Sequence, residues 1–163
     1  MGCRNSNKTR IIQKNPAVYV MGCPCHIVHN TAGKAGTAFE EVTGFNVEDL
    51  IIDLFNWFEK STKQKACLSE YCTFGDVNYG EVVKHVNMRW LSLERAVGRA
   101  LQQYDALKSY CLSEDDSSPR FQWLHAVFST LVTEIYLLFY QSALQVGLDG
   151  LFFFLPIILF FYS

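Results

Sequence analysis

The fold of this 163-residue chain is most clearly indicated by the stretch NVEDLIIDLFNWFEK, which occupies residues 46–60. Its large apolar residues recur every three or four positions, as they do on one face of an α-helix. They are Val47, Leu50, Ile51, Leu54, Phe55 and Phe58. Asn46 is a favourable N-cap residue, Asp49 stands at the third helical position, and Phe45 is placed to pack onto Leu50. We therefore predict an amphipathic helix here, with its apolar face in the core.

The same pattern extends over much of the chain. Residues 61–72 are expected to continue this helix, and further helices are expected over residues 25–41, 92–110 and 121–145. The stretch SEDDSSP at residues 113–119 is expected to be a solvated loop, and residues 74–80 a turn-rich break. Residues 17–21, AVYVM, lie between Pro16 and Gly22, which predicts a short buried strand. One strand has no partner for its backbone hydrogen bonds, so we expect the rest of a sheet to lie outside this chain.

Charge is distributed unevenly along the chain, although the net charge is only −2. The first acidic residue is Glu40, and five basic residues precede it. They are Arg4, Lys8, Arg10, Lys14 and Lys34. A basic segment ahead of an acidic body favours contact with a polyanion, either nucleic acid or an anionic membrane. We take the first four as candidate DNA contacts; the alternative is an ordinary solvated segment.

The densest group of metal-ligating residues is CPCHIVH, at residues 23–29. Thiolates and imidazoles are good Zn²⁺ ligands, and a structural zinc site takes four of them. The four candidates are Cys23, Cys25, His26 and His29. Structural sites usually separate paired cysteines by two to four residues, whereas one residue separates these two. We therefore predict that these side chains pack in the core without a metal, and a zinc site is the alternative.

Four blocks of sequence point to a family when they are taken together. They are GCPCHIVHNTA at residues 22–32, DLFNWFEKSTK at 53–63, RWLSLER at 89–95 and LLFYQSAL at 137–144. In this order the blocks resemble hAT-superfamily DNA transposases and transposase-derived proteins. The resemblance covers roughly residues 1–145. Cys23 and His26 fall on the family's Cys-x-x-His motif, and Arg89 and Trp90 fall on its Arg-Trp motif.

The resemblance implies a mostly α-helical fold with a short strand, a partial RNase H-like (α/β) transposase core followed by the start of its helical insertion. Within it we expect a core region at residues 1–112, a loop at 113–119, an apolar insertion helix at 120–145 and a divergent hydrophobic tail at 146–163.

In this family three acidic residues hold two divalent metals that activate water or a DNA 3′-hydroxyl. Two aspartates precede the Cys-x-x-His block and a glutamate follows the insertion, and this chain has none of the three at those places. We therefore expect no enzyme activity and no cofactor. The remaining roles are weak, non-specific DNA binding or binding to transposase-like proteins, in the nucleus.

Two features favour a membrane-associated protein instead. Gly2 and Cys3 lie in a Met-Gly-x-x-x-Ser pattern, which fits N-myristoylation beside a palmitoyl site. Residues 151–162, LFFFLPIILFFY, have only the tyrosine hydroxyl as a polar side-chain group. The apolar segment reaches about 17 residues, the lower limit for a membrane-spanning helix, and Pro156 interrupts it. We therefore keep open both membrane association through residues 146–163 and a degenerate tail that packs on the helices or aggregates.

Overall fold

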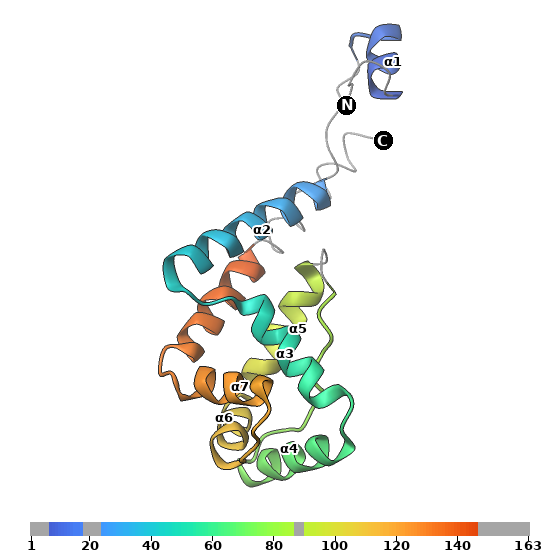
Figure 1. Cartoon of the computed structure of the whole chain (residues 1–163). Coiled ribbons are helices and arrows are strands. Elements are labelled where there is room, and N and C mark those ends of the chain that lie inside the picture. The colour runs from blue at the N-terminus through green and yellow to red at the C-terminus, as the bar shows by residue number, and fades with distance from the viewer. Residues whose placement is uncertain (1–6, 18–23, 87–89, 147–163) are drawn as a thin grey trace.

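The structure is a computed structural model that describes residues 7–17, 24–86 and 90–146, and most of these residues lie in α-helices (Figure 1). The labelled helices are α1 (Asn7–Lys14), α2 (Pro24–Thr43), α3 (Val47–Glu59), α4 (Thr62–Phe74), α5 (Trp90–Gln102), α6 (Tyr104–Ser113) and α7 (Pro119–Ser129). A further helix, which Figure 1 leaves unlabelled, covers Thr133–Val146. The described residues contain no β-strand.

Helix α3 confirms the strongest prediction from the sequence. The Asn46 side chain caps it by accepting a hydrogen bond of 3.0 Å from the Asp49 backbone N–H. The helix buries five of the six predicted apolar residues, and only Phe55 remains half-buried. Phe45 lies with its ring 5.4 Å from that of Tyr136, on the helix Thr133–Val146. The apolar face of α3 is therefore the surface on which the other helices pack.

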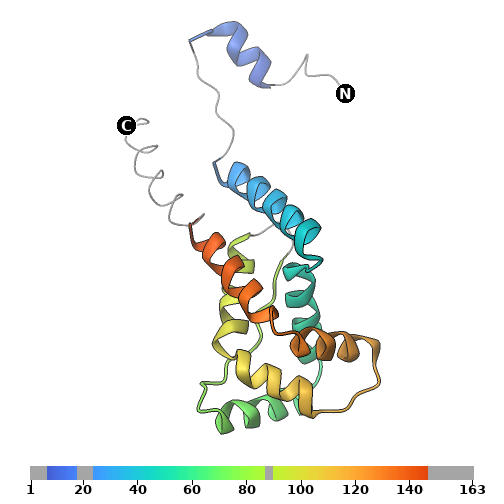
Figure 2. The ribbon, with the colours of Figure 1, turned by 90° about the vertical axis from the view of Figure 1, so that its left-hand side faces the viewer.

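Aromatic side chains join α3, α4, α6 and α7 around Tyr110. The Trp57 indole N–H donates a hydrogen bond of 3.1 Å to the Tyr110 hydroxyl. The ring of Tyr110 also lies 5.2 Å from that of Phe58, 5.8 Å from that of Tyr71 and 6.1 Å from that of Phe121. Packed aromatic pairs contribute beyond their buried area, so this cluster holds four helices to one centre. Figure 2 shows α6 and α7 meeting at this lower end of the molecule.

The prediction of one continuous helix over residues 92–110 is wrong, because Gln103 separates α5 from α6. Gln103 has a backbone φ of −122° and ψ of 28°, and only 1% of its surface is exposed. Its side-chain oxygen lies 3.8 Å from the Cys72 Sγ, within reach of a weak thiol hydrogen bond. A glutamine in the core therefore marks the break, whereas the apolar periodicity runs through it.

The helix predicted over residues 121–145 is also two helices. Helix α7 and the helix Thr133–Val146 meet at an angle of 87°. The hydroxyls of Ser129 and Thr130 donate to the backbone oxygens of His125 and Ala126, four residues earlier. The Thr133 hydroxyl donates at 2.6 Å to the Val127 oxygen. Side-chain bonds of this kind compete with helical backbone bonds, which accounts for the break.

The expectation of a partial RNase H-like α/β core is wrong, since the described residues form helices packed on helices without a sheet. Of the predicted strand at residues 17–21, Ala17 lies in a turn, and residues 18–21 lie outside the described residues. The physical reason is that helices α3 to α7 bury their apolar faces against one another, so their core needs no strand to complete it.

The aromatic ring of Phe39 packs helix α2 on the helix Thr133–Val146. The ring of Phe39 lies 5.4 Å from that of Tyr136 and 5.7 Å from those of Phe139 and Tyr140. In both views α2 and the final helix lie at the same end of the helical body, and α1 stands apart from it (Figures 1 and 2). This end of the molecule carries the candidate binding surfaces.

Candidate functional site

The helix Thr133–Val146 is apolar on two opposite sides. One side faces the core and is buried. It consists of Thr133, Leu137, Tyr140 and Leu144. The other side faces solvent, and with Leu131 from the preceding turn its large apolar residues are between 51% and 83% exposed. We call this second side the exposed apolar face and define it as Leu131, Ile135, Leu138, Phe139 and Val146.

Most of the exposed apolar face lies on one side of the helix. Ile135, Leu138, Phe139 and Val146 share that side at helical spacing, and the exposed Ser142 lies between Phe139 and Val146. Single exposed apolar residues are ordinary on soluble proteins, whereas a contiguous group marks an interaction surface or an aggregation risk. The hydrophobic run at residues 151–162 follows soon after this helix in the sequence and lies outside the described residues.

No helix in the described part of the chain is by itself long and apolar enough to cross a membrane. Helix α7 and the helix Thr133–Val146 together reach the length and composition of a span, but with a bend of 87°. Helix α7 also buries Phe121, Leu124 and Phe128 in the core. By length and composition alone, this bent pair is the nearest approach to a span among the described residues.

The residues predicted from the Cys-x-x-His and Arg-Trp motifs lie in separate elements. Cys23 and Arg89 lie outside the described residues, and Trp90 is the first residue of α5. Cys25, His26 and His29 belong to the first two turns of α2. Within the described ranges, no group of three or more histidine, cysteine, aspartate or glutamate residues is arranged to hold a metal ion.

The predicted DNA contacts fall partly on α1, a helix that the sequence patterns did not predict. Lys8, Arg10 and Lys14 belong to it, and Arg4 precedes the described residues, as do the lipidation candidates Gly2 and Cys3. Arg10 is exposed, and so are Lys14, Ile11 and Ile12.

Burial determines the chemistry of the described cysteines. Cys111 is fully buried, and burial raises the pKa of its thiol to about 12. Burial also raises the pKa of Cys72. Cys67 has its pKa raised first by burial and then by Glu114, whose carboxylate lies 3.5 Å from the Cys67 Sγ. Since the thiolate is the nucleophilic form, these three thiols are poorly suited to covalent catalysis.

One buried histidine was missed by the sequence analysis, and no motif there could have found it. The His85 side chain is 2% exposed, with its Nδ1 3.0 Å from the Ser92 hydroxyl. Its Nε2 lies 3.7 Å from a Glu48 carboxylate oxygen, which is too long for a hydrogen bond. Burial lowers the pKa of His85, and the negative charge of Glu48 opposes this with a smaller effect. The lowered pKa of His85 favours its neutral imidazole and so weakens an ion pair with Glu48.

Comparison of the chain with protein-family models, with curated proteins and with solved structures finds no match.

Proposed function

We propose that this chain is a catalytically incomplete, transposase-derived protein that binds a second transposase-like chain through the exposed apolar face. The observation that carries the proposal is the solvent-facing side of the helix Thr133–Val146, whose opposite side is already buried in the core. The four sequence blocks and the Arg-Trp and Cys-x-x-His motifs are the support for descent from a hAT transposase. This part of the proposal does not depend on an RNase H-like core. A second copy of this chain is the simplest such partner.

Burial of the exposed apolar face supplies the free energy for this association. Fully covering a Leu, Ile, Val or Phe side chain contributes roughly 1.5–3 kcal/mol. Association costs translational and rotational freedom, so several such side chains must be covered together for a dimer to form. Ile135, Leu138 and Phe139 lie within two helical turns and meet that requirement.

The oligomeric state tests this proposal directly. The chain ending at Gln145, which lacks the hydrophobic tail and Val146 but keeps the other four residues of the exposed apolar face, is expected to form a reversible dimer in sedimentation velocity experiments. The double variant Ile135→Gln, Leu138→Gln should weaken that dimer at least tenfold, and neither residue takes part in the ring packing on Phe39. The matched control is Phe74→Gln, because Phe74 is 94% exposed but lies at the end of α4. Monomers at all concentrations, or equal weakening by the control, would contradict the proposal.

The absence of catalysis is part of the same proposal. The family's chemistry needs three carboxylates around two metal ions about 4 Å apart, and no Asp or Glu precedes Glu40 in this chain. We expect no cleavage or strand transfer of DNA with terminal inverted repeats in the presence of Mg²⁺ or Mn²⁺. Metal-dependent cleavage that is lost when one acidic residue of this chain is changed would overturn this.

Any DNA binding is expected to be weak and independent of sequence. It would rest on Arg4, Lys8, Arg10 and Lys14, which precede an acidic body. About four phosphate contacts predict that the logarithm of the affinity falls with that of the salt concentration with a slope near −4. Sequence-specific binding that survives high salt would be inconsistent with this role.

Membrane association is the second candidate function, and one observation favours it. The exposed apolar face ends at Val146, and twelve apolar or aromatic residues follow at 151–162. An amphipathic helix followed by such a segment resembles membrane-bound elements that lie in the lipid interface. In a membrane-associated protein the exposed apolar face would lie against lipid instead of against a second protein. Acylation at Gly2 and Cys3 would strengthen the attachment to the membrane.

Alkaline carbonate extraction separates the two candidates. Cells expressing the full chain are compared with cells expressing the chain that ends at Gln145. If only the full chain stays with the membrane pellet, membrane association replaces the first proposal, and a nuclear location is abandoned. If both chains are extracted and the shorter one dimerises through the exposed apolar face, the first proposal stands.

A further inference from the structure

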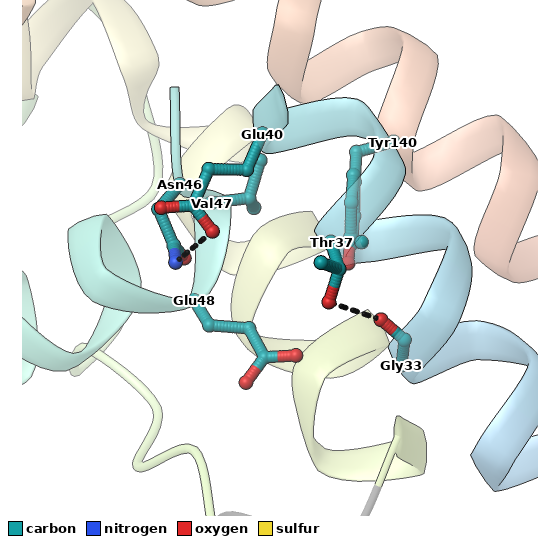
Figure 3. Close-up of a pocket in the computed structure, with 8 residues that line it drawn as sticks. Gly33, Thr37, Glu40, Asn46, Val47, Glu48 and Tyr140 are labelled. Carbon is teal, nitrogen blue, oxygen red and sulfur yellow. Dashed lines mark hydrogen bonds between the residues drawn. The ribbon is translucent and has the colours of Figure 1, made fainter. Parts of the chain in front are cut away.

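A surface pocket with a volume of about 120 Å³ lies where α2, the start of α3 and the helix Thr133–Val146 meet (Figure 3). Helix α2 contributes Gly33, Gly36, Thr37 and Glu40 to its lining, α3 contributes Glu48, and the final helix contributes Tyr140. At ~30 Å³ for each molecule of liquid water, the pocket has room for about four waters. This is the size of a small polar group.

Two glycines on α2 make the space. A Cβ at Gly33 would meet no atom within 4 Å, so the position opens directly into the pocket. A Cβ at Gly36 would lie 2.6 Å from the Tyr140 hydroxyl oxygen, so only glycine lets this phenol approach α2 so closely. Figure 3 shows the end of the Tyr140 side chain beside Thr37.

Tyr140 supplies an unused polar group. The residue is 7% exposed, its ring packs edge-on against Phe39, and its hydroxyl makes no hydrogen bond to the described residues. Burial, with a smaller contribution from Glu48, raises the pKa of Tyr140 to about 12, so the hydroxyl stays protonated. The hydroxyl oxygen borders the pocket, where it can accept a hydrogen bond from a polar group held in that space.

The remaining polar groups are hydrogen-bond acceptors. Thr37 uses its proton to donate to the Gly33 oxygen at 3.1 Å, which leaves its own oxygen free to accept. One carboxylate oxygen of Glu40 accepts from the Asn46 amide at 2.9 Å, and the other has no such bond among the described residues. In Figure 3 the Glu48 side chain extends from α3 toward Thr37 and Gly33. Its charge is balanced by no lysine or arginine of the pocket lining.

We propose that this pocket binds a small organic cation with several N–H donors, namely a guanidinium or an alkylammonium group. Two carboxylates supply the negative charge, and the Thr37 and Tyr140 oxygens supply neutral acceptors. A guanidinium has four non-hydrogen atoms and five N–H donors, which fits both the volume and the number of acceptors. The group comes either from a free amine or from the Arg or Lys side chain of another protein.

Titration of the ¹⁵N-labelled full chain with methylguanidinium, followed by amide NMR, tests the site. We expect saturable shifts at the Gly33 and Gly36 amides with an affinity of roughly millimolar, because the pocket is open to solvent. Urea has nearly the same shape but no charge and should leave both amides unshifted. A capped Gly-Gly-Arg-Gly-Gly peptide distinguishes the sources: binding at least threefold tighter than methylguanidinium indicates a protein side chain, and weaker binding a free amine.

Variants complete the test without requiring a change in the core. Glu40→Gln and Glu48→Gln should each raise the Kd at least fivefold. Glu41→Gln, one position along α2 at an exposed site, is the matched control and should leave it unchanged. Gly33→Ala fills the pocket without a clash and should also weaken binding. Equal weakening by the Glu41 control, equal shifts with urea, or tighter binding of Ca²⁺ at the same amides would overturn the proposal.

Discussion

Replacement of Tyr110 by phenylalanine removes one oxygen from the centre of the core and leaves its ring contacts in place. The hydroxyl accepts a 3.1 Å hydrogen bond from the half-buried Trp57 indole, and Tyr110 itself is buried. A hydrogen bond of this kind contributes about 0.5–1.5 kcal/mol net, and leaving its partner unsatisfied adds to the loss. We therefore expect Tyr110→Phe to lower the free energy of unfolding by about 1–2 kcal/mol. Tyr110→Ala also removes the ring and should cost about 3–5 kcal/mol.

A double-mutant cycle with Trp57→Phe isolates the hydrogen bond. Unfolding by urea is followed through far-UV circular dichroism, because a change of tryptophan would alter the fluorescence signal. The coupling between Tyr110→Phe and Trp57→Phe should be about 1 kcal/mol. Trp123→Phe is the control, since Trp123 is also half-buried but its indole makes no hydrogen bond to the described residues. A coupling below about 0.3 kcal/mol, or one equal to that of the control, would refute the reasoning.

Four further predictions concern groups that the fold buries, brings close together or leaves beside open space. Burial lowers the pKa of His85 below the unfolded value of 6.5, so the unfolded chain binds a proton first. The contribution of His85 to the free energy of unfolding should therefore be fully present above that pH and should be lost as the pH falls through the folded pKa. His85→Gln should flatten this decline in urea titrations at several pH values. Gly36→Ala should destabilise the protein because its Cβ meets the Tyr140 hydroxyl, and Tyr140→Phe should recover part of that loss in thermal unfolding. Gly33→Ala, at a helical position with open space, should stabilise it by about 0.5–1 kcal/mol. Cys111 should resist iodoacetamide in the native protein and react after unfolding, because it is fully buried with a pKa of about 12; mass mapping that finds it modified in the native state would contradict its burial.

Local patterns predicted the helices whose signals are contained in their own residues. Helix α3 has a cap at Asn46 and an apolar face at helical spacing, and both are present in the structure. Helix α2 was likewise predicted within a few residues of its ends. The segment at 61–72 is helical as predicted, but it begins as a separate helix because the Ser61 hydroxyl accepts a hydrogen bond from the Gln64 N–H.

The two helix breaks depend on tertiary contacts. Gln103 lies within an apolar periodicity that continues on both sides, and only its burial beside Cys72 explains why α5 stops there. In the segment 121–145 apolar residues occur on every side, so periodicity cannot tell where the chain bends. The strand expected at residues 17–21 lies outside the described residues except for Ala17, which is in a turn. A short apolar run indicates burial more reliably than it indicates the type of secondary structure.

The sequence by itself determined that this chain is mainly helical, where α2 and α3 lie, and which charged and hydrophobic segments flank the body. Only the tertiary structure decided which apolar side of the helix Thr133–Val146 is buried and which faces solvent. It also brought Tyr140 against Gly36, more than one hundred residues earlier in the chain, and Glu48 toward His85. The physical reason is that the periodicity of apolar residues indicates which side chains are buried, whereas the residues that they contact depend on how separate helices pack.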